Sequence, residues 1–190
     1  MKGEEKQVKQ AVTNLGNAID KESDSYMRLL EKAKSGASTP KDLLRLSDAQ
    51  MESVYAQAYR LYNTGKYIEA ADLFRSLIVG NSTETKYSLG LAACFHLMRE
   101  FDAAAQLYLF CNMLDEKSPI PSFHASDCYL QMRDKTSALV SLTMAIDKAG
   151  DRPEYKILKD RATLTAKAIK KELKLTDADE ENLTKASKLL

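Results

Sequence analysis

Small and aromatic residues recur at intervals of 34 positions through the middle of this chain. The clearest series is Ala70, Ala104 and Ala138. Repeats of this length, with small residues at fixed positions, are typical of stacked helix–turn–helix units. The pattern therefore predicts an all-α fold with three helix pairs. Three further series keep the spacing: Phe74, Tyr108 and Leu142; Leu61, Phe95 and Tyr129; and Ala58, Ala92 and Ser126.

The repeat length and the positions of the small residues indicate a tetratricopeptide-repeat helical array. Such arrays need an end helix with one polar face to close the core. An apolar stripe after Pro153, which includes Leu158, Ala162 and Ile169, predicts this capping helix. We expect a repeat domain over 47–175, followed by a polar tail at 176–190. Its repeats should lie at about 51–84, 85–118 and 119–152, and its end helix at 153–175. The turns within the repeats should lie at 64–66, 98–100 and 132–134.

Residues 1–34 predict a separate N-terminal amphipathic helix. Val8, Val12 and Leu15 step by four and three residues, which is the spacing of one helical face. Residues 35–46 predict a linker and a short element, because Ser, Gly and Pro interrupt the helical pattern there. The apolar stripe suits a homodimer contact, a lid on this chain or a contact with a partner, and its heptad-like spacing favours the homodimer.

Composition and charge narrow the function classes. The net charge is +1, from 28 basic and 27 acidic residues, so no charge excess points to nucleic acid. No apolar stretch approaches the roughly 20 residues that span a bilayer. The N-terminal residues lack the apolar core of a secretory signal. We therefore expect a cytoplasmic protein that neither inserts into membranes nor binds nucleic acid.

Motifs for catalysis or metal binding are not evident in the sequence. Cys94, Cys111 and Cys128 are 17 residues apart, which is half a repeat, so they follow the repeat and not a metal-binding pattern. We expect them to be buried, reduced thiols. Motifs that bind phosphate, dinucleotides or catalytic zinc are absent from the sequence. The sequence therefore predicts no enzyme, no cofactor and no metal.

The first helix of each pair lines the concave face of such an array, through positions 5, 9 and 12 of the motif. In the first repeat these positions hold tyrosines, which suit an extended apolar peptide because each combines a large ring with a hydroxyl group. Alternatively, the tyrosines pack in the core or against the N-terminal helix. A clamp for a C-terminal carboxylate is disfavoured, since it needs Lys, Asn or Arg at these positions. The predicted groove residues are Tyr55, Tyr59, Tyr62, Tyr67, Leu89, Ala93, His96, Phe123, Asp127 and Leu130.

Three segments carry a more specific pattern than the generic repeat. They are MESVYAQAYRLYNTGKY at 51–67, YSLGLAACF at 87–95 and SFHASDCYLQ at 122–131. Together with AIKKEL at 168–173, they resemble the class II chaperones of bacterial type III secretion, the LcrH/SycD-like translocator chaperones. The resemblance implies a chaperone of the bacterial cytoplasm that binds membrane-inserting translocator proteins before export. The resemblance also implies which residues line the client groove: Tyr55, Tyr59, Tyr62, Tyr67, Leu89 and Phe123.

The resemblance leaves the client and the mode of dimerisation open. The predicted N-terminal helix is longer than the family usually shows, and Arg99 and Arg133 replace glycines in two turns. A gatekeeper protein of the secretion apparatus is a further candidate partner, because some members of the family engage one. The alternative function is a generic tetratricopeptide-repeat scaffold without a role in export. A client that precipitates without this chain would favour the chaperone.

Overall fold

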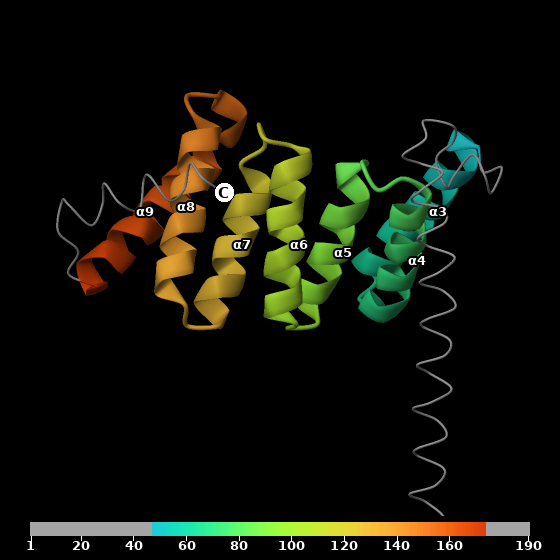
Figure 1. Cartoon of the computed structure of the whole chain (residues 1–190), viewed down its shortest axis with the longest axis horizontal. Helices are drawn as coiled ribbons and strands as arrows, with labels where there is room; N and C mark the ends of the chain where they lie inside the picture. The colour runs from blue at the N-terminus through green and yellow to red at the C-terminus, as the bar shows by residue number, and fades with distance from the viewer. Residues whose placement is uncertain (1–46, 174–190) are drawn as a thin grey trace, which may run out of the picture. The chain divides into compact units, whose positions relative to one another are not determined.

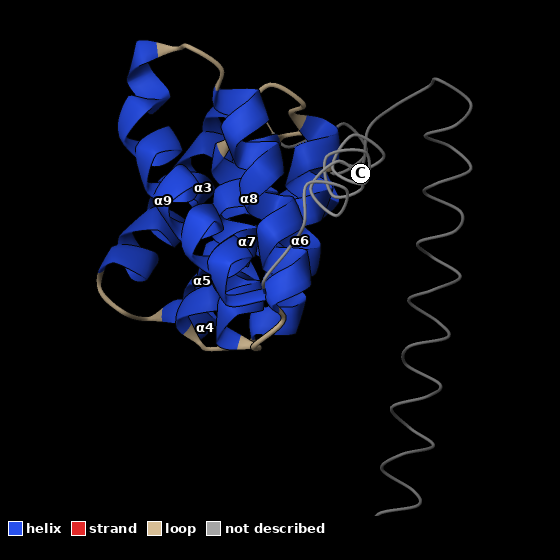
Figure 2. Cartoon of the chain, turned by 90° about the vertical axis from the view of Figure 1, so that its left-hand side faces the viewer, coloured by secondary structure: helices blue, strands red, loops and turns tan. Residues whose placement is uncertain are grey.

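The computed structural model describes residues 47–173, which form antiparallel helices side by side (Figure 1). Each helix packs mainly against the helices before and after it in the sequence, as expected for a repeat array. No strand occurs in these residues, and Figure 2 shows helices joined by short loops. The helices are α3 (Asp48–Asn63), α4 (Tyr67–Gly80), α5 (Thr85–Leu97), α6 (Phe101–Leu114), α7 (Ile120–Gln131), α8 (Lys135–Ala149) and α9 (Lys156–Leu173), with a 3₁₀ turn at Pro153–Tyr155.

The predicted array of three helix pairs followed by an end helix is therefore confirmed. Three other predicted features lie outside the described residues: the N-terminal helix at 1–34, the linker at 35–46 and the tail at 176–190. The predicted homodimer contact lies outside them too, since it depends on the N-terminal helix. Between residues 47 and 173, no helix is long and apolar enough to cross a membrane.

The three predicted turns coincide with the breaks between the paired helices. Each contains a residue in the left-handed region of backbone space: Gly65 with φ of 79°, Arg99 with 65° and Arg133 with 62°. Only glycine adopts this conformation without a steric cost from Cβ. The two arginines therefore keep the turn geometry of the glycine and carry some backbone strain.

Side-chain hydrogen bonds mark where the helices of the third repeat begin. The carboxylate of Asp115 accepts hydrogen bonds from the amides of Lys117 and Ser118, at 3.1 and 3.2 Å. The hydroxyl of Ser118 accepts a hydrogen bond from the amide of Ile120 at 3.4 Å, and the helix begins at Ile120. Asp134 caps α8, because its carboxylate accepts from the amide of Ser137 at 3.0 Å.

The inter-helix core contains the repeated residues that revealed the period. Ala70, Ala104 and Ala138 are fully buried, so neighbouring helices approach each other closely at these points. Phe74 and Tyr108 fill the adjacent space from the second helices of repeats one and two. All three cysteines are buried and free. Burial raises the pKa of the Cys94 thiol to about 11 and of the Cys111 and Cys128 thiols to about 12, so they stay protonated and unreactive.

Candidate functional site

Two neighbouring hollows lie along the concave positions of the first helices. The first has a volume of about 170 Å³ and lies between α3 and α5. Its walls are almost entirely apolar or aromatic, so it suits an apolar side chain. The residues that line it are Tyr55, Tyr59 and Tyr62 of α3, Phe74 of α4, and Lys86, Leu89, Gly90 and Ala93 of α5.

The tyrosines of α3 form a continuous aromatic ridge beside this hollow. The ring centres of Tyr55 and Tyr59 lie 6.3 Å apart, and those of Tyr59 and Tyr62 lie 6.5 Å apart. Both pairs are stacked with rings 24° from parallel, because residues at i, i+4 and i+7 share one helical face. Tyr59 is 53% exposed, so a large aromatic surface faces solvent at the middle of the ridge.

A glycine allows the floor of the first hollow to form. A Cβ atom at Gly90 would lie 2.4 Å from the ring of Phe74, a distance that side chains cannot tolerate. The absence of a side chain at Gly90 therefore lets the Phe74 ring pack directly under α5. That ring also meets Tyr55 edge-on, with centres 6.1 Å apart, and so supports the base of the ridge.

Lys86 stands at the rim of the first hollow with its charge already engaged. Its Nζ lies 2.7 Å from a carboxylate oxygen of Glu52 and 4.6 Å from the ring centre of Tyr55. The hydrogen bond to Glu52 raises the pKa of Lys86. Since one ammonium group is shared between a carboxylate and an aromatic face, this site offers little to a client carboxylate.

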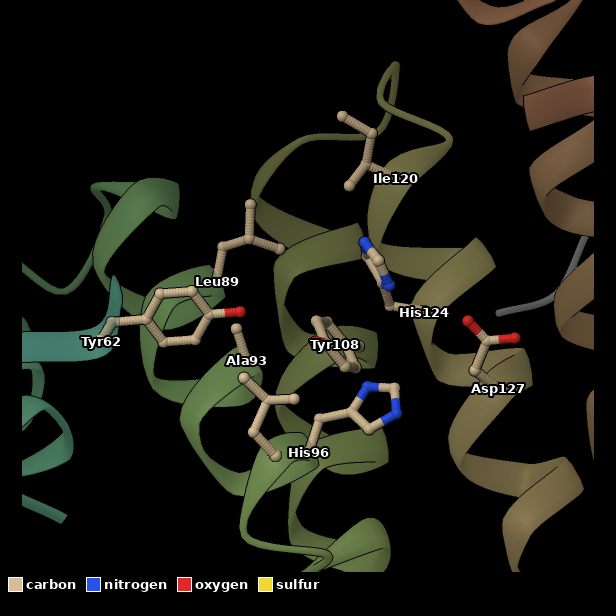
Figure 3. A pocket seen from close by; sticks show the side chains of 9 residues that line it. Tyr62, Leu89, Ala93, His96, Tyr108, Ile120, His124 and Asp127 are labelled. Atoms are coloured by element: carbon tan, nitrogen blue, oxygen red, sulfur yellow. The ribbon is translucent and has the colours of Figure 1, made fainter. Parts of the chain in front are cut away.

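The second hollow is larger and more polar than the first. Its volume is about 380 Å³, and Figure 3 shows Tyr62 entering it from one side while His96 and His124 lie on the other. Tyr62, Leu89 and Ala93 line both hollows, so the two are neighbouring parts of one groove. The remaining residues around the second hollow are His96, Leu97, Tyr108, Ile120, His124 and Asp127.

The polar groups of the second hollow are held close to uncharged aromatic surfaces. The rings of Tyr108 and His124 stack with centres 5.4 Å apart, and those of His96 and His124 lie 6.4 Å apart. Burial lowers the pKa of His124, so its imidazole is neutral at neutral pH. Burial raises the pKa of Asp127, while His124 and His96 act in the opposite direction. The second hollow thus combines hydrogen-bonding groups with apolar walls.

The two hollows combine apolar area with a few hydrogen-bonding groups, which suits a segment of polypeptide chain. Between residues 47 and 173, no group of three His, Cys, Asp or Glu side chains could hold a metal ion. The buried thiols do not line either hollow. What the groove provides is apolar area, tyrosine hydroxyls and a few polar groups, which is the chemistry of peptide recognition.

Comparison with known proteins identifies the repeat and relates the chain to a characterised protein. The model of the tetratricopeptide-repeat family matches residues 51–79 and 86–117. The low calcium response locus protein H of Yersinia pseudotuberculosis is 32% identical to the chain over 149 residues. These residues make up 78% of this chain and 89% of the relative, so the likeness covers nearly the whole of that protein.

Solved structures of type III secretion proteins are also similar to this chain. The type III secretion chaperone SycD of Yersinia enterocolitica, solved with a peptide of the translocator YopD, is 32% identical with a TM-score of 0.65, over 67% of this chain and 97% of SycD. The chain belongs to the family of type III secretion translocator chaperones. A solved CopN–Scc3 complex is also similar, with 27% identity and a TM-score of 0.65, over 66% of this chain and 74% of that one.

The structure brings most of the predicted groove residues of this chaperone-family chain together. Tyr67 lies outside both hollows, and its ring meets Tyr62 with centres 5.7 Å apart. Tyr67 therefore supports the ridge from its end. The predicted residues that line one or both hollows are Tyr55, Tyr59, Tyr62, Leu89, Ala93, His96 and Asp127.

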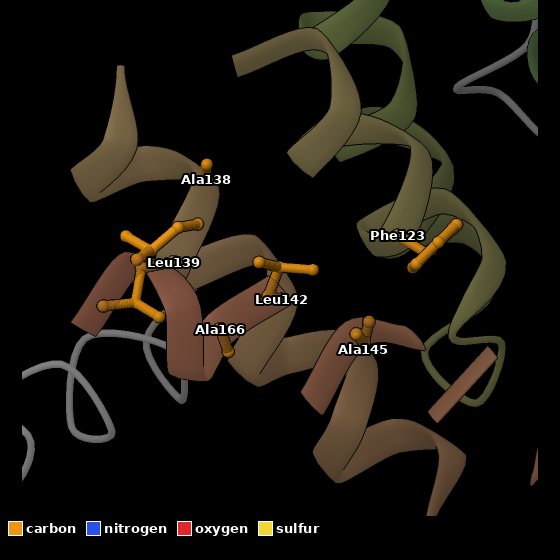
Figure 4. Packing of buried hydrophobic residues seen from close by; sticks show 8 residues of the cluster. Phe123, Ala138, Leu139, Leu142, Ala145 and Ala166 are labelled. Atoms are coloured by element: carbon orange, nitrogen blue, oxygen red, sulfur yellow. The ribbon is translucent and has the colours of Figure 1, made fainter. Parts of the chain in front are cut away.

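Two predicted groove residues of α7 belong to the core instead. Phe123 is only 8% exposed and packs in a cluster with Leu139 and Leu142 of α8 and Ala166 of α9 (Figure 4). Leu130 is half-buried and packs against the same cluster. Phe123 therefore lies in the core and not on the open face of the groove, because α8 and α9 enclose this part of α7.

Several residues that complete the two hollows were not predicted from the sequence. Phe74 and Tyr108 come from second helices, which the repeat motif assigns to the core, yet the ring of each reaches a hollow. His124 follows Phe123 in the specific segment of α7, and that segment was the available signal for it. The other lining residues that were not predicted are Lys86, Gly90, Leu97 and Ile120, for which a single sequence offers no comparable signal.

Proposed function

We propose that this chain is a cytoplasmic chaperone that holds an extended segment of a type III translocator protein in its concave groove. The observation that carries the proposal is the stacked ridge of Tyr55, Tyr59 and Tyr62 beside an apolar hollow. Soluble proteins rarely expose a contiguous aromatic surface unless it binds something. Membership in the translocator chaperone family supports the identity of the bound class.

The geometry favours an extended client segment with apolar side chains. The first hollow can enclose one apolar side chain, and Leu89 and Ala93 continue the apolar wall into the second hollow. Tyrosine hydroxyls and the polar groups around His96 and Asp127 can bond the peptide backbone or a polar side chain of the client. Binding would cover apolar surface of a membrane-seeking protein and so keep it soluble, with no need for ATP or catalysis.

The partner set follows from the same comparison. The solved complex of SycD with a YopD peptide supports a translocator as the client of this chain. The solved complex of CopN with Scc3 supports a second kind of partner, which we take to be the gatekeeper protein of the secretion apparatus. A homodimer through residues 1–34 stays a separate prediction, and loss of mass in light scattering after deletion of residues 1–38 would support it.

Co-expression and affinity capture test the proposed function. The tagged full-length chain should capture a translocator from its own bacterium, identified by mass spectrometry, and Tyr59→Ala should capture less of it. Ile68→Ala is the matched control, because Ile68 is an exposed apolar residue of α4 that lines neither hollow. Equal capture by Tyr59→Ala and the unmodified chain would contradict the groove assignment.

The solubility of the client separates the chaperone from a scaffold. A translocator that precipitates when expressed alone and stays soluble with this chain indicates a chaperone. A partner that is soluble alone, and that only assembles with other proteins through this chain, indicates a scaffold. Both results are read from the soluble fractions of the same co-expression experiment.

A further inference from the structure

The end helix α9 presents two large apolar side chains to solvent. Ile157 is 76% exposed and Leu164 is 68% exposed, more than Tyr59 on the aromatic ridge. They lie seven residues apart, so they share one helical face and are separated by roughly 10 Å along the helix. Another face of α9, with Ala162 and Ile169, is buried in the core. The side chains of Ile157 and Leu164 therefore contribute little to the packing of the array.

The repeat register aligns this exposed face with the concave surface. Ile157, Arg161 and Leu164 follow Phe123, Asp127 and Leu130 of α7 by 34 positions each. Phe123 and Leu130 pack in the cluster with α8 and α9, whereas Ile157 and Leu164 are exposed. The three α9 residues are therefore positions 5, 9 and 12 of a fourth unit, and the same positions hold the tyrosine ridge in α3. Pro153 follows Pro119 at the same interval. Helix α9 thus occupies the place of the first helix of a fourth repeat.

Side-chain contacts place Arg161 beside the groove. Its guanidinium carbon lies 5.4 Å from the centre of the Phe123 ring. Its charge also acts on His124 and Asp127, which line the second hollow. Arg161 lies between Ile157 and Leu164 on one helical face, so this face of α9 lies next to α7, whose residues His124 and Asp127 line the second hollow, although no α9 residue lines it. The face that Ile157, Arg161 and Leu164 share is here called the α9 stripe.

We propose that the α9 stripe extends the groove and holds the far end of the client segment. The inference rests on the proposed function, because both concern the same client. Ile157 and Leu164 would each cover an apolar side chain of the client, and Arg161 between them would pair with an acidic one. The matching client sequence therefore carries an acidic residue between two apolar residues at one end.

The size of the surface sets the length of client that it can bind. Helices α3, α5, α7 and α9 are the first helices of successive units (Figure 1). They pack mainly against the second helices between them, so each step is at least the roughly 10 Å that separates packed helices. An extended chain advances about 3.3 Å per residue. A client that spans the surface from Tyr59 to the α9 stripe therefore needs at least about 10 residues in extended form.

Selection from a phage-displayed library of random peptides, about 16 residues long, tests the proposal on the full-length chain. We expect the selected peptides to carry an apolar–acidic–apolar pattern at one end. The affinity of the most enriched peptide should fall about tenfold in the double variant Ile157→Ser/Leu164→Ser, as expected when two interface anchors are removed. The matched control Ile68→Ser removes an apolar side chain that is 67% exposed on α4 and should change the affinity less than about twofold.

The outcomes separate this inference from the proposed function. A peptide that loses affinity for Tyr59→Ala but not for the double variant would overturn the extension and leave the groove standing. A chain that selects no peptide would contradict the groove and the extension together. If the double variant alone has a lower mass in light scattering, the α9 stripe is a contact between copies, and the extension is overturned. Thermal melts of both variants should match the unmodified chain, because the substituted side chains are exposed.

Discussion

Helices α3 and α7 hold the same motif positions, and their side chains meet different surroundings. In α3 the three positions carry Tyr55, Tyr59 and Tyr62, which are half-buried or exposed beside the first hollow. In α7, Phe123 is buried at the position equivalent to Tyr55. The position of a residue in the repeat therefore gives the direction of its side chain, and the neighbouring helices decide whether that side chain is open to a partner.

The neighbours of the two helices explain the difference. Helix α7 packs against α6 and α8, and residues of α9 complete the cluster around Phe123. Helix α3 packs against α4 and makes only a slight contact with α5. The aromatic side chains of α3 thus remain accessible to a partner, as the proposed function requires, whereas the aromatic side chain of α7 packs between α7, α8 and α9. Aromatic residues at equivalent positions therefore differ in exposure between α3 and α7.

Truncation of Phe123 should give the largest loss of stability. Phe123→Ala removes a buried ring from the cluster with Leu139 and Leu142, and we expect the free energy of unfolding to fall by about 3–5 kcal/mol. Urea denaturation followed by circular dichroism measures this fall. Phe110→Ala is the matched control, since Phe110 is an exposed residue of α6. A fall of the same size in both variants would show that the α7 ring is no more buried than the α6 ring.

Truncation of Tyr59 should weaken client binding and leave the stability of the fold nearly unchanged. Tyr59→Ala removes the middle of the exposed ridge, and we expect client binding to weaken by about 1–3 kcal/mol, the range for an aromatic interface anchor. The free energy of unfolding should change by less than about 0.5 kcal/mol, because the side chain is largely outside the core. Calorimetric titration and denaturation of the same samples separate the two effects. Tyr59→Phe keeps the ring and reports what the hydroxyl group adds; a large loss of stability in Tyr59→Ala would make Tyr59 a core residue.

These two positions also show how far a single sequence can predict this molecule. The period of 34 places Gly65, Arg99 and Arg133 in equivalent turns, because turn geometry is local and repeats with the sequence. It also places the ridge of α3 on the concave face. It cannot show that α9 covers Phe123, since that depends on how the end helix packs against α7 and α8. Nor can it show that the Phe74 ring reaches the groove under Gly90, because this contact joins two repeats.

The half-buried His124 and Asp127 of α7 have no counterpart in α3 and predict a pH effect. Burial lowers the pKa of His124 below its ordinary value of 6.5, so the folded chain favours the neutral imidazole. The contribution of the neutral imidazole to the free energy of unfolding is complete when the pH is above the pKa that His124 has in the unfolded chain. It is lost as the pH falls below that pKa, by at most about 1.4 kcal/mol per pH unit. Urea denaturation between about pH 7.5 and pH 5.5 measures this slope.

A substitution at the histidine isolates its part of that slope. His124→Gln cannot titrate, so its stability should depend less on pH than that of the unmodified chain. Burial raises the pKa of Asp127, and protonation of this carboxyl at lower pH acts in the opposite direction, because it relieves the burial of a charge. Asp127→Asn should therefore steepen the loss of stability at the acid end. Identical pH profiles for His124→Gln and the unmodified chain would contradict the burial of the imidazole.

The turns after α3 and α7 give the smallest expected effect. Gly65 and Arg133 adopt the same left-handed conformation, with φ of 79° and 62°, but only the arginine has a Cβ that opposes it. Arg133→Gly should therefore raise the free energy of unfolding by about 0.5–1 kcal/mol, since relief of the strain exceeds the added flexibility of the unfolded chain. Arg60→Gly, in the last turn of α3, is the control and should lower it by about 0.5–1 kcal/mol. Denaturation midpoints measure both changes, and a loss of stability in Arg133→Gly would show that the arginine side chain contributes more to the turn than its backbone strain removes.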